Sequence, residues 1–381
     1  MRKSYIFELL IVSLAFAVSC DRNETPLEEP CDLIQIAASG EDVQTRGLLN
    51  MADLPTVDTK VKIYDYLTGF TGKIGNAEYT NGNVMYIDDE VKCVTAGTTD
   101  APKGSWDFVT APWRWTRTGT HHFFGWLTDD NSVSPALTSP FGETFDETTR
   151  KLTVPAITLA DNTDQFDFSY SKIVTKAAPE NVEIPLKHLF TALKVQVKNT
   201  IPTELKELSV SLSGIMNGRT ATIDFSATPS EAGVTDVTAA YAGGALADFS
   251  LANAQTKTIP AAPVPTTETP NPVINPVALY TDNDGFRMLW PQDNLGQVTA
   301  ATVKFKIGTD TYVNTLTGSL KDVFPDNKME AGKKYVLTII VSPIEIRFKV
   351  IVDPLDEYYY GRDDNPEDDN TNDYSDYLIK L

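Results

Sequence analysis

Apolar and polar residues alternate with a period of two through much of the chain after residue 60. This pattern is typical of strands with one buried face, because successive side chains of a strand point to opposite sides of a sheet. The clearest runs occupy residues 60–63, 193–198, 208–212, 303–307 and 344–352. Only two stretches, residues 187–193 and 319–324, suit even a short helical turn. The pattern therefore predicts an all-β fold of β-sandwiches, with many short strands separated by turn residues.

Two Asn-Gly steps stand between strand-like residues, at Asn81-Gly82 and Asn217-Gly218. Asn-Gly favours a tight hairpin turn, because both central positions of that turn adopt positive φ. We therefore predict a hairpin at each step.

A break between two domains is predicted near Pro202, where an Asn-Thr-Ile-Pro-Thr sequence interrupts two strands. This places an N-terminal sandwich at residues 47–199 and a C-terminal sandwich at residues 200–357. The proline-rich residues 259–276 have strands on both sides, so we expect them to form a loop inside the second domain.

The first twenty residues have the features of an export signal. Two basic residues precede an apolar core at residues 9–18, which is too short to span a bilayer. Small or apolar residues then precede Cys20, as in the lipobox of bacterial lipoproteins, although the usual leucine is absent. We expect residues 1–19 to be a signal peptide and Cys20 to be acylated, which would anchor the chain to a membrane surface. The alternative is an ordinary signal peptide cut near residue 19.

Residues 20–46 combine a polar tether with a short strand. Residues 33–38 are apolar and include β-branched residues, and a Ser-Gly pair ends this run. The polar residues that follow are the kind of exposed loop in which proteolytic cleavage concentrates. We interpret residues 33–38 as a removable strand and Arg46-Gly47 as a trypsin-like cleavage step. The plain alternative is a solvated loop arginine.

The C-terminal residues 358–381 form an acidic tail with an apolar end. Tyr377, Leu378, Ile379 and Leu381 lie at this end, and three of them would share one face of an extended strand. Such a segment either packs on the chain's own sheet or adds a strand to a neighbouring molecule through backbone hydrogen bonds.

Charge and cysteine content narrow the range of partners. The 381 residues include 52 Asp and Glu against 32 Lys and Arg, a formal charge of -20, and contain no basic stretch. Nucleic acid is therefore not an expected partner. If Cys20 is acylated, Cys31 and Cys93 are the two cysteines left, and they form either a disulfide or two unpaired thiols. A disulfide would tether the removable strand to the rest of the chain.

Motifs for catalysis, cofactor binding or metal binding are not found. His121 and His122 are adjacent, so in a strand they would point to opposite faces and could not bind one metal together. We expect them, and His188, to be packing residues. Neither a nucleophile elbow nor a phosphate-binding glycine loop is present. We therefore expect neither an enzyme nor a bound cofactor or metal.

Closely spaced tryptophans support a different function, glycan binding. Trp113 and Trp115 would share one face of a strand and could stack on sugar rings if that face were exposed. Tryptophans in such a pattern more often pack in a core. A monomeric surface glycan-binding lipoprotein is therefore the alternative function.

Several motifs, in this order along the chain, resemble those of the fimbrillins, the subunits of type V pili. They are the lipobox-like residues before Cys20, the Arg46 step, and Phe168-Ser-Tyr170 followed by a strand-like stretch at residues 182–195. Residues 288–292, with the sequence Met-Leu-Trp-Pro-Gln, and residues 332–335, with the sequence Gly-Lys-Lys-Tyr, complete the set. The resemblance covers most of the chain.

The resemblance implies two transthyretin-like Greek-key β-sandwich domains in tandem and a function in adhesion and colonisation. It also implies an outer-membrane lipoprotein acylated with palmitate at Cys20, and an arginine-specific processing protease that cuts at Arg46-Gly47. The strand at residues 33–38 would be excised, and the C-terminal strand of a neighbouring pilus subunit, here residues 377–381, would fill the groove. The Cys31 and Cys93 pair departs from the family pattern, as does Pro354-Leu355 where a tryptophan is expected.

Overall fold

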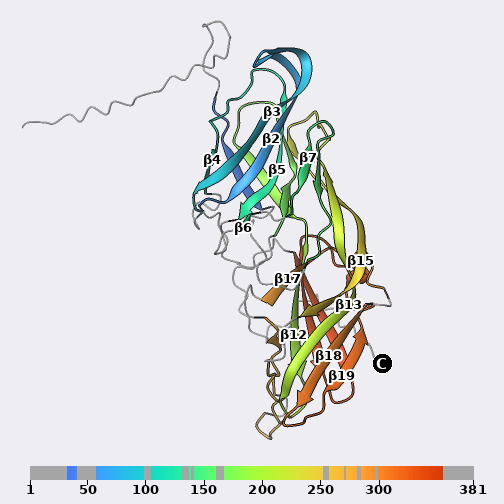
Figure 1. The fold of residues 1–381 in the computed structure, drawn as a ribbon. Helices are drawn as coiled ribbons and strands as arrows, with labels where there is room; N and C mark the ends of the chain where they lie inside the picture. The colour runs from blue at the N-terminus through green and yellow to red at the C-terminus, as the bar shows by residue number, and fades with distance from the viewer. Residues whose placement is uncertain are drawn as a thin grey trace, which may run out of the picture.

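The computed structural model describes residues 32–40, 57–97, 104–130, 137–138, 141–159, 167–251, 257–269, 272–280, 285–296 and 299–354. These residues form strands almost throughout, and helical structure among them is limited to short 3₁₀ turns such as η3 (Pro325–Asn327). Figure 1 shows an elongated molecule with β2, β3 and β4 toward one end and β12, β18 and β19 toward the other. The all-β fold predicted from the alternating pattern is confirmed.

The first sheet has ten strands and contains the N-terminal strand β1. Its main path runs β1-β11-β9-β5-β2-β3-β4, with β6 and β10 pairing to β5, and β14 pairing to β10. The bounds are β1 (Ile36–Gly40), β2 (Lys60–Ile74), β3 (Ala77–Thr95), β4 (Ser105–Phe108), β5 (Thr120–Asp130), β6 (Leu137–Thr138), β9 (Ser169–Ser171), β10 (Ile173–Lys176), β11 (Val182–His188) and β14 (Gly233–Thr235).

Two smaller sheets complete the molecule. The six-stranded sheet has the order β19-β18-β13-β8-β7, with β15 paired to β13. The five-stranded sheet has the order β16-β12-β20-β21, with β17 paired to β12. Their bounds are β7 (Thr144–Asp146), β8 (Lys151–Val154), β12 (Thr191–Asn199), β13 (Leu205–Asp224), β15 (Ala239–Leu251), β16 (Val277–Ala278), β17 (Phe286–Leu289), β18 (Ala300–Ile307), β19 (Asn314–Ser319), β20 (Lys333–Val341) and β21 (Ile346–Pro354).

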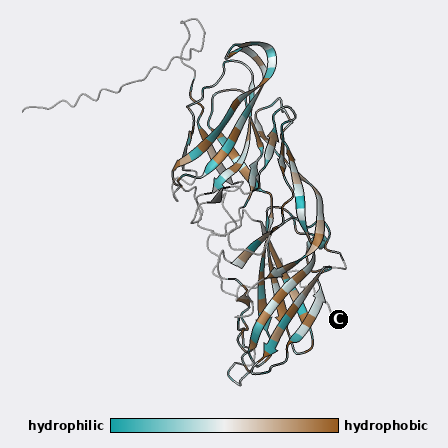
Figure 2. Ribbon diagram, viewed as in Figure 1, coloured by the Kyte–Doolittle hydropathy of each residue, from teal (hydrophilic) through white to brown (hydrophobic). Residues whose placement is uncertain are grey.

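The buried side chains of these sheets form two hydrophobic clusters. The first lies mainly on strands of the ten-stranded sheet, and the second on β12 and the strands that follow it. Strand β13 contributes to both, with Leu205 to Leu212 in the second cluster and Ala221 and Ile223 in the first. Figure 2 shows hydrophobic and hydrophilic residues alternating along the strands, as expected for strands with one buried face.

Strand β12 lies at the place where the sequence predicts the end of the first domain. Its inward side chains, Leu193, Val195 and Val197, belong to the second cluster. The strand pairs in parallel with β20, more than a hundred residues later in the chain. The exact division into domains stays a prediction, but β12 packs with the C-terminal half.

The two Asn-Gly steps do not form hairpin turns, so this prediction is wrong. Strands β2 and β3 are joined by a turn at Gly75 and Asn76, whereas Asn81-Gly82 lies inside β3, where Asn81 has a φ of 52° and the register with β2 shifts. Asn217-Gly218 lies inside β13, where the Asn217 side chain binds the backbone N–H and C=O of Leu159 at 3.0 and 2.8 Å. Positive φ at these steps accommodates irregularities in long strands rather than chain reversal.

Candidate functional site

The candidate site is the seam in the ten-stranded sheet that is occupied by residues 32–40, which we call the β1 segment. Its side chains alternate between the core and solvent: Ile34, Ile36 and Ala38 are 5%, 6% and 0% exposed, whereas Leu33 and Gln35 are exposed. Burial of each isoleucine contributes about 1.5–3 kcal/mol of hydrophobic stabilisation. Residues 36–38 of the predicted removable strand therefore lie in the sheet. Whether the strand is removed stays a prediction.

Backbone hydrogen bonds hold the β1 segment on two edges. On one edge, residues 36–40 pair in parallel with β11, from Ile36 opposite Val182 to Gly40 opposite Leu186. Just before this pairing, the Val182 N–H donates to the Gln35 carbonyl at 2.9 Å. This bond extends the pairing with β11 by one residue, from Ile36 to Gln35.

The other edge is formed by residues 113–115, which we call the flanking segment. The Ile34 N–H donates to the Trp113 carbonyl at 2.9 Å, and the Trp115 N–H donates to the Asp32 carbonyl at 3.0 Å. These bonds flank an antiparallel bridge between Leu33 and Arg114. The β1 segment therefore lies between β11, at one end of the sheet order, and a segment that follows β4, at the other end.

The flanking segment is fixed by its side chains and by one carbonyl. Trp115 is 4% exposed and packs edge-on against His121 and Phe123, with ring centroids 4.7 and 5.8 Å away. The half-buried Trp113 donates from Nε1 to the Asp89 carboxylate at 2.8 Å. The Tyr86 hydroxyl donates to the Arg114 carbonyl at 2.8 Å. Because Trp115 is buried, the two tryptophans do not form the exposed stacking surface that glycan binding would require.

Beneath Trp115, a buried network links Thr116, His121 and Asp65. His121 Nδ1 lies 2.5 Å from Asp65 Oδ2, and His121 Nε2 lies 2.8 Å from Thr116 Oγ1. The arrangement has the atoms of a hydroxyl–imidazole–carboxylate triad. However, the single hydroxyl proton of Thr116 is donated to the Thr118 carbonyl at 2.8 Å, so His121 Nε2 must itself be a donor to Oγ1. The imidazole is therefore not poised as a base toward Thr116, and the network ties a loop to the core.

The sequence analysis did not identify Asp65, the buried carboxylate of this network. It is fully buried, which raises the pKa of its carboxyl, while the hydrogen bond and charge of His121 oppose that rise. A signal for it existed: Asp65 follows Ile63 and precedes Leu67 in the inward phase of β2, where an apolar residue is expected.

The other two histidines are also packing residues. His122 makes contacts of 3.1 Å with the Thr175 hydroxyl and 2.9 Å with the Thr68 hydroxyl. Its burial, together with the charges of Arg150 and His121, lowers its pKa to about 4. His188 Nδ1 lies 2.6 Å from the Asp167 carboxylate. Among the residues that the structure describes, no group of three or more His, Cys, Asp or Glu side chains is placed to hold a metal.

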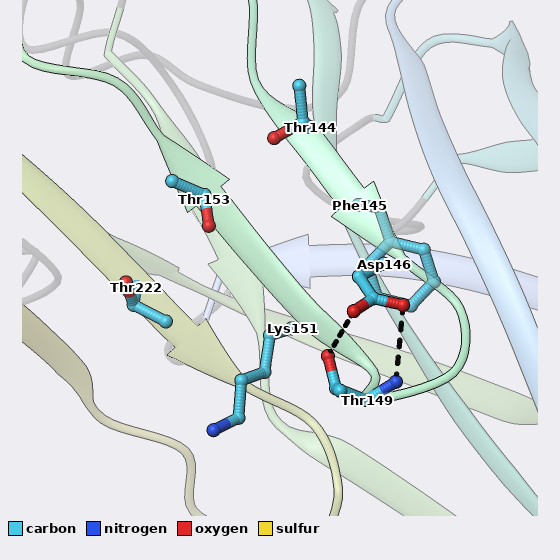
Figure 3. A pocket seen from close by; sticks show the side chains of 7 residues that line it. All are labelled: Thr144, Phe145, Asp146, Thr149, Lys151, Thr153 and Thr222. Carbon is cyan, nitrogen blue, oxygen red and sulfur yellow. Dashed lines mark hydrogen bonds between the residues drawn. The ribbon is translucent and has the colours of Figure 1, made fainter.

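A shallow pocket of about 330 Å³ lies over β7, β8 and β13. Figure 3 shows the threonine hydroxyls, Asp146 and Lys151 that line it, and the bonds from Thr149 to the Asp146 carboxylate. These bonds and one from the Thr148 N–H lower the pKa of Asp146. The Phe145 ring packs instead on Tyr64, with ring centroids 4.4 Å apart. The pocket is thus a polar sheet face next to a hydrogen-bonded turn, and its aromatic residue is engaged with the core.

Several predicted site residues lie outside the described part of the chain. They are Cys20, Cys31, Arg46, Gly47 and the donor residues Tyr377, Leu378, Ile379 and Leu381. Cys93 is described: it is buried, and its Sγ donates to the Thr95 carbonyl at 3.3 Å. The Cys31–Cys93 disulfide therefore stays a prediction. In the described part of the chain, helices lack the length and hydropathy to cross a membrane.

Comparison with known proteins assigns the chain to a family. Residues 56–353 match the model of the fimbrillin-like family, and the chain belongs to that family. This confirms the resemblance to fimbrillins that the motifs indicated.

Three solved structures illustrate how distant its structural neighbours are. A candidate cell adhesion protein from Bacteroides uniformis is 12% identical, with a TM-score of 0.46 and coverage of 85% of this chain and 99% of that one. A fimbrial assembly protein from Parabacteroides distasonis is 12% identical, with a TM-score of 0.36 and coverage of 86% and 100%. The tip fimbrial protein Mfa3 from Porphyromonas gingivalis is 11% identical, with a TM-score of 0.33 and coverage of 85% and 100%. No curated protein matches the chain.

Proposed function

We propose that this protein is a structural subunit of a surface pilus that assembles by strand exchange and serves adhesion and colonisation. Membership of the fimbrillin-like family supports the pilus role. The observation that carries the strand exchange is the β1 segment, which supplies three buried side chains to the first cluster but comes from the extreme N-terminal part of the described chain.

In this proposal the chain is exported as a lipoprotein and held at the outer membrane by acylated Cys20. A protease then cuts between Arg46 and Gly47, which lie between the β1 segment and β2 in the sequence. Loss of the β1 segment leaves unpaired backbone groups on β11 and on the flanking segment. Residues 377–381 of a neighbouring subunit then fill the seam and restore those hydrogen bonds.

Limited proteolysis tests this function. The chain lacking residues 1–20 is treated with trypsin, its new N-terminus is sequenced, and assemblies that survive SDS without heating are sought on gels. We expect one early cut after Arg46 followed by ladders, and neither from the Arg46→Ala variant. Deletion of residues 377–381 should leave cleavage intact and abolish the ladders. A trimmed protein that stays monomeric under these conditions would refute strand exchange.

Cys31 offers an internal control. If it forms a disulfide with Cys93, the cut segment stays attached until a reductant is added. Comparing the wild type with the Cys31→Ser variant, with and without reductant, separates a tethered strand from one that never leaves the sheet.

A further inference from the structure

A strand that replaces the β1 segment must form backbone hydrogen bonds along two edges, not one. We infer that an incoming strand is clamped between β11 and the flanking segment, and that it runs in the direction of the β1 segment. The incoming strand would be an extended, alternately apolar segment of a neighbouring subunit. This inference rests on the proposed strand exchange and specifies how the partner strand is recognised.

The flanking segment is built as a docking edge. The bond from the Tyr86 hydroxyl occupies the Arg114 carbonyl, while the bonds made by the Trp113 carbonyl and the Trp115 N–H both point to the β1 segment. The buried Trp115 ring and the Trp113–Asp89 bond hold this edge at its two ends. The edge is therefore fixed by contacts that do not involve the β1 segment.

Loss of the β1 segment would leave backbone groups without partners on both edges. The Trp113 carbonyl and the Trp115 N–H would lose their bonds on one side, and the Val182 N–H would lose its bond on the other. Leaving buried backbone groups unpaired is costly, so an occupant that reaches both edges binds better than one that pairs with β11 alone.

Strand β12 shows that this chain uses the same arrangement elsewhere. Its one edge pairs in parallel with β20, and its other edge pairs antiparallel with β16 and β17. The β1 segment likewise has a parallel partner in β11 and an antiparallel partner in the flanking segment. An incoming strand in the direction of the β1 segment reproduces this pairing.

A peptide-rebinding experiment tests the second edge directly. A cleavage sequence for a site-specific protease is placed between residues 41 and 50, so that release of the β1 segment does not depend on Arg46. After cleavage and removal of the segment, a synthetic peptide of residues 32–40 is added. Hydrogen exchange at the Trp115 and Val182 amides then reports each edge separately. Both amides should lose protection on release and regain it with the peptide.

Backbone N-methylation of the peptide provides matched variants. Methylation at Ile34 removes the donor to the Trp113 carbonyl, and we expect it to weaken binding about 10- to 100-fold. Methylation at Leu33 is the control, because the N–H of this bridge residue faces away from the flanking segment. We expect the control peptide to bind within about threefold of the parent, since it loses no bond to that edge.

The outcomes separate this inference from the proposed function. Equal binding of the two methylated peptides, rebinding that protects Val182 but not Trp115, or failure of the parent peptide to rebind would overturn the two-edge clamp. Retention of the cut segment with both amides still protected would overturn it as well. Ladder formation is scored independently: the clamp can hold in a protein that forms no ladders, and ladders can form without it.

Discussion

Strands β1 and β12 have corresponding pairing partners in two different sheets, but they are held very differently. Each has a parallel strand on one edge and antiparallel pairing on the other. Strand β12 pairs with β20 over eight residues, from Ala192 to Asn199, whereas β1 pairs with β11 over five. In the sequence, β12 lies between β11 and β13, and both of these strands also belong to sheets of the molecule. Under the proposed strand exchange, the same position in a sheet carries a permanent strand in β12 and an exchangeable one in β1.

The largest expected effect comes from placing a charge inside each strand. Val195→Asp would put a carboxylate at a position that is 1% exposed in β12, and we expect it to destabilise the protein by more than about 4 kcal/mol, because the strand cannot leave the core. Ile36→Asp should instead detach the β1 segment and leave the rest folded. Thermal unfolding measures the global loss, and exchange at the Val182 amide measures the local one.

Substitutions on the outward faces are the controls for this pair. Lys194→Asp and Gln35→Asp place the same charge on half-buried and exposed positions of the two strands. Both should fold with nearly unchanged stability. If Ile36→Asp unfolds the whole protein as Val195→Asp does, the contrast between the two strands is wrong.

A smaller effect is expected from overfilling the seam. Ala38 is 0% exposed, so Ala38→Leu should cost about 1–3 kcal/mol through overpacking. Ala37 is half-buried on the other face, and Ala37→Leu should cost about 0.5 kcal/mol or less. Denaturant unfolding followed at the Val182 amide compares the two. Equal costs would show that the seam does not select side chains by size.

A third effect, similar in size to the second, is a difference in acid sensitivity. All three histidines lie on strands of the ten-stranded sheet, and His122 has a pKa of about 4 against an unfolded value near 6.5. Well above pH 6.5 the imidazole is neutral in both states and the stability is complete. As the pH falls from 6.5 toward 4, the unfolded chain binds a proton that the folded chain does not, so stability is lost. The loss between pH 7.5 and 4.5 should be about 2.5 kcal/mol.

The His122→Gln variant isolates this contribution, because glutamine does not titrate. Urea unfolding at the two pH values should show a smaller loss of stability for the variant than for the wild type. An identical pH dependence in the two proteins would show that the buried imidazole does not resist protonation.

The sequence predicted which faces of the strands are buried better than it predicted their partners. Alternation gave the inward positions of β12, because burial follows the period of two. For residues 33–38 the sequence indicated a strand but not which of its faces is buried. It could not pair Ile36 with Val182, since period sets a face and not a partner. The Asn-Gly steps misled because positive φ serves a strand irregularity as well as a turn.

The site was less predictable than the fold. The second edge of the seam is made of backbone groups of Trp113 and Trp115, and backbone groups leave no sequence signature. The side chains of these residues drew attention for their aromatic rings, yet their carbonyl and N–H hold the β1 segment. Tertiary contacts decide whether such a residue acts through its aromatic ring or through its backbone groups.

Strand β13 has a mechanical consequence. Its twenty residues run unbroken from the second hydrophobic cluster into the first, so the two clusters share one continuous length of backbone. A tensile load along that strand would act on its many cross-strand hydrogen bonds in shear, and they would have to break together rather than one after another. Separating the two clusters would mean drawing the strand lengthwise out of its neighbours, so the molecule should yield to stretching only at high force.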